Sequence, residues 1–185
     1  MTNQSNTNAE SKPEPDSAAR TVEDRIDGFI TLLRSYAREG QENRAALAAL
    51  RSGLRGQVEH APAMHSHVVP FLEKKPHQSD RWFYLVGALF AWHPAHRAGR
   101  SLGAAFRELK NQEGASASIE ARFSALLASD ERDLHLHLRQ AIGMLKAHDV
   151  RLDWKLLLRD LALHRGWRHP ERAVQMRWAR HFYQS

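Results

Sequence analysis

The longest apolar stretch of the chain runs from Trp82 to Trp92, and every residue in it is apolar, aromatic or glycine. At about 100° per residue, such a run places apolar surface all the way round a helix, so no face of the helix suits water. Its eleven residues are too few to cross a membrane, which takes roughly 20. The pattern therefore predicts a central buried helix, capped at its start by Ser79 and ended by His93-Pro94.

Apolar residues at helical spacing predict further helices on both sides of this run. Before it, helices are expected from Thr21 to Gly40, from Gln41 to Ser52 and, broken near Pro70, from Ala63 to Leu72. After it, helices are expected from Ser101 to Lys110, from Ser116 or Ser118 to Leu127, from Glu131 to His148, from Asp153 to Gly166 and from Pro170 onward. No segment alternates in the way that a strand does, so the chain is predicted to be all-α, a compact bundle of about eight or nine helices.

Composition divides the chain into a tail and a domain. Residues 1–20 are mostly Asn, Ser, Thr, Glu and Pro, a composition that cannot offset the entropy of ordering, so a disordered tail is expected. Residues 21–185 are expected to form one domain, or two lobes of about 21–110 and 116–185. The sequence has no cysteine and no secretion signal, which fits a cytoplasmic protein without disulfides or cysteine-based metal sites.

The charge indicates an anionic partner, because 27 Lys and Arg residues against 21 Asp and Glu residues give a net charge of +6. Residues seven apart drift only about 20° round a helix. Arg132, Arg139 and Lys146 should therefore form one basic row. Shorter sets on other helices are Arg44 with Arg51, and Arg177 with Arg180. Such rows suit a phosphate backbone; the alternative is that they are ordinary solvated faces, partly paired with carboxylates.

No catalytic signature accompanies these rows. There is no Gly-rich phosphate loop, no Gly-x-Ser-x-Gly elbow and no nucleophilic cysteine. Among the 12 histidines, His135 and His137 point to different sides of a helix, so they cannot chelate one metal. His148-Asp149 matches the pair found in metal-dependent phosphohydrolases, but no further ligands stand at supporting spacings. We therefore expect no enzyme, no metal and no cofactor, with a metal-dependent phosphohydrolase as an alternative.

Several segments, taken in their order, resemble one known family. They are Asn43-Arg-Ala-Ala-Leu-Ala-Ala-Leu-Arg51, the aromatic helix before His93-Pro94, Ser101-Leu-Gly103, Glu120-Ala-Arg-Phe-Ser-Ala-Leu-Leu-Ala-Ser129, Leu138-Arg139, Leu152-Asp153-Trp154-Lys-Leu-Leu-Leu-Arg-Asp160 and Val174-Gln-Met-Arg-Trp-Ala-Arg-His-Phe-Tyr183. This order resembles CasB, the small subunit of the type I-E CRISPR Cascade complex, over roughly residues 22 to 183. None of the motifs is catalytic, and the similarity lies in their combination.

The resemblance implies an all-helical, non-catalytic subunit that is present in two copies in the complex. Its expected partners are the backbone filament, the large subunit, the guide RNA, and the target and displaced DNA strands. It would stabilise the guide RNA–target DNA hybrid and the displaced strand of the R-loop in antiviral defence, without sequence preference. No membrane partner is implied.

The candidate nucleic-acid-binding residues come from two sources. Arg51, Arg122 and Arg139 lie in segments where the family also has basic residues, whereas Arg107, Lys110, Arg132 and Lys146 follow from spacing. Arg122 could instead pair with Glu120. Two other functions stay open: an all-α adaptor that binds acidic protein surfaces, and a helical DNA-binding regulator.

Overall fold

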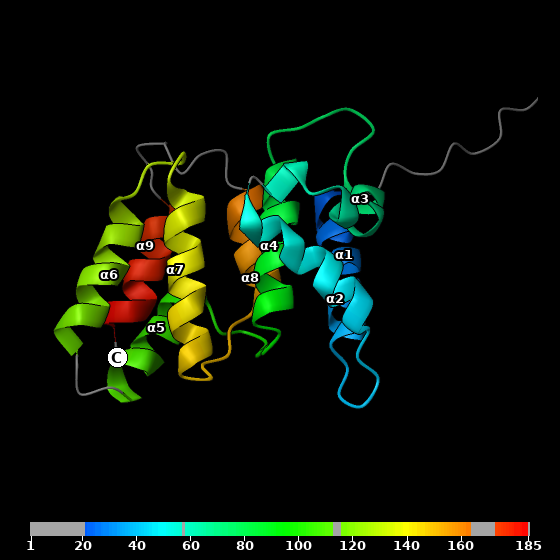
Figure 1. Cartoon of the computed structure of the whole chain (residues 1–185). Coiled ribbons are helices and arrows are strands. Elements are labelled where there is room, and N and C mark those ends of the chain that lie inside the picture. Colours follow the sequence, from blue (N-terminus) through cyan, green and yellow to red (C-terminus); the bar gives the residue numbers. More distant parts are fainter. Residues whose placement is uncertain (1–20, 57, 113–115, 164–172, 185) are drawn as a thin grey trace, which may run out of the picture.

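In the computed structural model, which describes residues 21–56, 58–112, 116–163 and 173–184, the chain is all helical (Figure 1). In chain order, the α-helices and 3₁₀ turns (η) of these residues are α1 (Val22–Tyr36), α2 (Arg44–Arg51), η1 (Ser52–Arg55), η2 (Val58–His60), α3 (Pro62–Val68), η3 (Val69–Phe71), α4 (Asp80–Trp92), α5 (Leu102–Gln112), α6 (Ser116–Ala128), α7 (Leu134–Ala147), α8 (Trp154–Ala162) and α9 (Ala173–Tyr183). The all-α prediction is confirmed. None of these helices has the length and apolar content that crossing a membrane requires.

Helix α4 lies at the centre, as its apolar pattern predicted. Every residue from Trp82 to Ala91 is buried, and α1, α2, α3, α7 and α8 all contact the helix. Ser79 is the N-cap residue of α4, as predicted, but its hydroxyl does not cap the first turn. Ser79 has helical dihedral angles and makes no side-chain cap bond, because its hydroxyl is hydrogen-bonded to Nδ1 of His77 at 2.8 Å.

The helices form two groups that are not consecutive in the sequence. Figure 1 shows α5, α6, α7 and α9 on one side and α1 to α3 on the other, with α4 and α8 between them. Helix α5 packs along α9, while α8 packs against α4 and α1. A division of the chain between residues 110 and 116 would therefore separate α5 from its main neighbour, so the spatial groups do not follow that boundary.

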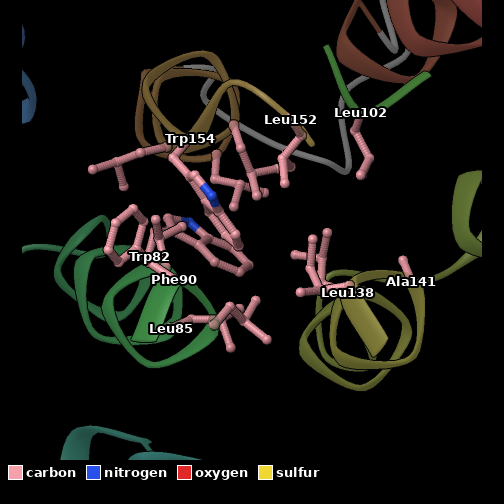
Figure 2. Close-up of a cluster of buried hydrophobic side chains, with 14 of the residues drawn as sticks. Trp82, Leu85, Phe90, Leu102, Leu138, Ala141, Leu152 and Trp154 are labelled. Carbon is pink, nitrogen blue, oxygen red and sulfur yellow. The ribbon is translucent and has the colours of Figure 1, made fainter. Parts of the chain in front are cut away.

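One continuous hydrophobic cluster joins the two groups. Figure 2 shows Leu85 of α4 and Leu138 of α7 pointing toward one another, with the Trp154 indole close by at the start of α8. Trp154 is fully buried, and its indole N–H donates to the carbonyl oxygen of Ala95 at 3.1 Å. The indole therefore fastens the start of α8 to the segment that follows α4.

Several residues at which helices were expected to start cap those helices. Thr21 and Asp24 form the capping box of α1, and the hydroxyl of Ser101 accepts from the backbone N–H of Ala104 at 3.2 Å. The Asp153 carboxylate caps α8 and also accepts from the N–H of Gly99 at 2.7 Å. The same carboxylate thus caps a helix and anchors the loop before α5.

Other helix boundaries differ from the prediction. Helix α1 ends at Tyr36 rather than Gly40, and α2 begins only after Asn43, whose side chain accepts from Ala46 N at 3.0 Å. Ser118 lies inside α6 and is not its cap. Both predicted boundaries at Gly166 and Pro170 lie outside the described residues.

The start of α7 also differs, and this affects the basic row. The helix begins at Leu134 rather than Glu131, because the preceding residues form a turn in which Asp133 N donates to Asp130 O at 3.1 Å. Arg132 therefore lies in this turn, just before the helix that holds Arg139 and Lys146.

Candidate nucleic-acid interface

The seven candidate cations fall into two sets. Those near α7 are Arg51, Arg132, Arg139 and Lys146, and those on α5 and α6 are Arg107, Lys110 and Arg122. The first set contains all three members of the predicted row along α7. We call Arg132, Arg139 and Lys146 the α7 row.

All members of the α7 row are exposed. Arg139 and Lys146 lie about two helical turns, or about 10 Å, apart along the axis. Leu138, Ala141 and Leu145 lie on another face of the helix and are buried. The apolar spacing therefore fixed which side of α7 faces solvent.

A hydrogen bond brings the α7 row against the segment that follows α2. The Arg139 guanidinium donates through Nη1 to the carbonyl oxygen of Leu54 at 2.5 Å. Leu54 lies in η1, between the exposed side chains of Arg51 and Arg55. The contact therefore brings η1, where the exposed Arg55 follows Leu54, against Arg139 of the row. Arg51 lies further back in α2 and donates through Nε to the carbonyl oxygen of Leu47 at 3.1 Å.

The cations of the first set are not neutralised by ion pairs within the protein. Within the described part of the chain, none of Arg51, Arg132, Arg139 and Lys146 pairs with a carboxylate. The ammonium of Lys146 lies 5.1 Å from the centre of the Trp92 ring, a contact that orients a cation without neutralising it. The charges stay available to an anionic ligand.

The set on α5 and α6 is different, because one of its members is neutralised by a carboxylate. Lys110 pairs with Glu120 at 2.9 Å and lies over the Phe182 ring at 5.2 Å. The hydrogen bond from Lys110 lowers the pKa of the Glu120 carboxyl. Arg107 donates to the carbonyl oxygen of Gln184. Arg122 is exposed, and among the described residues Glu120 forms its ion pair with Lys110 and not with Arg122, the partner considered from the sequence.

On α9, one predicted surface cation has an internal role. Arg177 pairs with Asp160 of α8, a carboxylate whose residue is 7% exposed. Asp160 also accepts from the indole N–H of Trp178 at 2.6 Å. This network ties α9 to α8, so Arg177 contributes to stability rather than to an open basic row.

A groove of about 720 Å³ lies beside the first half of α7. Its walls come from η2, the start of α4, and the turn before α7 with its first residues. Sequence reasoning missed one of its residues, Arg81, which pairs with Glu131, another residue of the groove lining. No local signal marks this pair, because its members are 50 positions apart in the sequence. No group of three or more possible metal ligands occurs among the described residues.

The chain matches the family model for CRISPR-associated protein Cse2 over residues 46–183. A CRISPR-associated protein Cse2 from Thermus thermophilus is 39% identical over 142 residues, which cover 75% of this chain and 79% of that protein. The chain belongs to the CRISPR-associated Cse2 family.

Solved structures of similar chains agree with the Cse2 assignment. CasB from Thermus thermophilus is 36% identical, with a TM-score of 0.71, and the match covers 86% of this chain and 98% of that one. A chain from a CRISPR RNA-guided surveillance complex is 26% identical, also with a TM-score of 0.71, over 88% of this chain and 93% of that one. The resemblance to CasB drawn from the order of segments is confirmed.

One buried histidine joins α4 to the end of α7 in this Cse2 fold. His93 is 4% exposed, and its Nε2 hydrogen-bonds to the carbonyl oxygen of Val150 at 2.8 Å. Burial lowers the pKa of His93 below its ordinary value of 6.5. The hydrogen bond to Val150 and the charge of Asp149 raise this pKa, but by less. Burial also lowers the pKa of His96.

Stability should therefore fall on acidification below the ordinary histidine pKa. A lowered pKa means that the unfolded chain binds more protons than the folded one. The contribution of His93 to the free energy of unfolding is therefore fully present above pH 6.5 and is lost as the pH falls toward the pKa of the folded state. The melting temperature should drop between about pH 7.5 and about pH 5.5. His93→Gln should show a smaller drop than the wild type. His60→Gln, which changes an exposed histidine, should keep the wild-type drop, and an equal drop in all three proteins would contradict the role of His93.

Proposed function

We propose that this protein is a non-catalytic subunit of a CRISPR surveillance complex of the Cascade type. It binds nucleic acid without sequence preference and stabilises the guide RNA–target DNA hybrid and the displaced strand in the cytoplasm. The observation that carries the proposal is the exposed α7 row, with η1 and its Arg55 brought against Arg139 and no carboxylate partner for any member of the row within the described chain. The relative found in an RNA-guided surveillance complex supports the setting.

The physical basis is charge neutralisation along a phosphate backbone. The distance between the helical members of the row, about 10 Å, corresponds to about three steps of one strand at about 3.4 Å per step. Arginine and lysine at that spacing can each neutralise a phosphate without reading a base. R-loop formation exchanges one duplex for another of similar stability, so a few backbone contacts shift the balance.

The other basic set contributes less in this proposal. Lys110 is neutralised by Glu120, whereas Arg107, like Arg139, donates to a backbone carbonyl and keeps its charge. Within the complex, the remaining surface would contact the backbone filament, the large subunit and a second copy of this chain. The α7 row would face the guide RNA and the target and displaced DNA strands.

Filter binding of the full chain to single-stranded and duplex DNA over a salt series tests the proposal. The logarithm of the association constant should fall linearly with the logarithm of salt concentration, with a slope of about −2 for three contacts to a single strand. Binding to acidic proteins in the absence of any DNA binding would favour the adaptor function instead. Cleavage of DNA by purified protein after addition of divalent metal would contradict a non-catalytic role.

A further inference from the structure

The groove beside the α7 row has the size and lining of a ligand pocket. Its volume of about 720 Å³ lies in the range of about 300–1,000 Å³ that is usual for such pockets. Val58, Trp82 and Leu85 give it an apolar side. Trp82 and Leu85 are core residues, so this wall is rigid.

Arg81 forms the polar part of the wall and is held in place from two sides. Its guanidinium carbon lies 4.3 Å from the centre of the Trp82 ring, and its Nη2 pairs directly with Glu131, which also lines the groove. The side chain still keeps 35% of its surface exposed, while its Nε is buried with no hydrogen-bond partner among the described residues. A fixed, planar and partly open guanidinium is a surface on which a nucleobase stacks.

The charges decide which part of a nucleotide fits the groove. Glu59 and Glu131 also line it, so the two carboxylates balance the two guanidinium groups of Arg81 and Arg132. A phosphate inside the groove would meet both carboxylates, whereas a base would meet hydrogen-bond acceptors for its amino groups. The net positive charge lies outside, on Arg139 and the neighbouring Arg55, where a backbone phosphate would bind.

We infer that this groove accepts one unpaired base of a bound single strand, stacked on Arg81, while Arg139 and Lys146 of the α7 row hold the adjoining phosphates. The inference rests on the proposed nucleic-acid-binding function and adds a base-binding site to it. Stacking is tolerant of sequence because every base has a π-face. The site would therefore distinguish unpaired from paired nucleic acid without reading the sequence.

The test compares two single-stranded oligonucleotides of equal length and phosphate number, one of deoxyadenosine and one without bases. The full wild-type chain should bind the strand with bases about tenfold more tightly. The double variant Arg81→Gln/Glu131→Gln leaves the net charge unchanged and should bind both strands with nearly equal affinity. A matched control, Lys155→Gln/Asp27→Asn, removes an exposed ion pair of 2.5 Å elsewhere and should keep the tenfold preference.

A second measurement does not depend on the variants folding. A strand with one 2-aminopurine should lose fluorescence when it binds the wild-type chain, because stacking quenches that base. Equal binding of both strands by the wild type, or no quenching at saturation, would overturn the base site and leave backbone binding intact. A preference that survives in the Arg81/Glu131 variant would also overturn it, and failure to bind either strand would overturn the proposed function as well.

Discussion

Replacing Gly103 with alanine is expected to destabilise the protein by about 3 kcal/mol, at the upper end of the cost of overpacking a core. A methyl group on Gly103 of α5 would overlap the carbonyl oxygen of Trp178 and lie 2.8 Å from its carbonyl carbon. Both are backbone atoms of α9, so no side-chain rotation relieves the clash. Helices α5 and α9 would have to move apart.

The direction of the stability change in Gly103→Ala is informative, because intrinsic helix propensity predicts that alanine would stabilise the protein. Alanine in a helix is favoured over glycine by about 1 kcal/mol. Thermal unfolding should nevertheless show a melting temperature lower by about 6–12 °C. Gly56→Ala is the control, since a methyl group there meets no heavy atom within 4 Å. An unchanged or raised melting temperature in Gly103→Ala would show that α5 and α9 do not pack this closely.

Removing the charge of the whole α7 row should have the largest effect on binding. The triple variant Arg132→Gln, Arg139→Gln and Lys146→Gln loses three unpaired, exposed cations. Each phosphate contact to a single strand contributes about 0.7 to the salt slope. The slope for single-stranded DNA should therefore become shallower by about 2, and the affinity at low salt should fall at least about a hundredfold.

A second triple variant separates the position of the charges from their number. Lys74→Gln, Lys155→Gln and Arg159→Gln makes the same change in net charge, but Lys155 and Arg159 already pair with carboxylates of α1. This control should keep most of the wild-type slope and affinity. An equal loss in both triple variants would mean that overall charge, and not the α7 row, governs binding. In a reconstituted surveillance complex, the α7 variant should also shorten the lifetime of the R-loop.

The sequence by itself determined the helices and their buried sides. The apolar run of α4 leaves no polar face, so burial is its only stable arrangement in water. Arg139 and Lys146, at heptad spacing, each lie about 100° round the helix from a buried leucine, and this likewise placed these cations on the solvent side of α7. These properties depend on residues within a few turns of one another, which is why periodicity reveals them. The order of such segments also sufficed to indicate the family.

Tertiary structure alone decided which cations stay free and where the groove lies. Lys110 is neutralised by Glu120, and Arg177 by Asp160, although each looks like a surface cation in its own helix. Arg81 meets a carboxylate 50 positions further along the chain. An ion pair depends on the distance between two groups in space. The sequence fixes that distance only within a helix, and the packing of α4 to α9 sets it everywhere else.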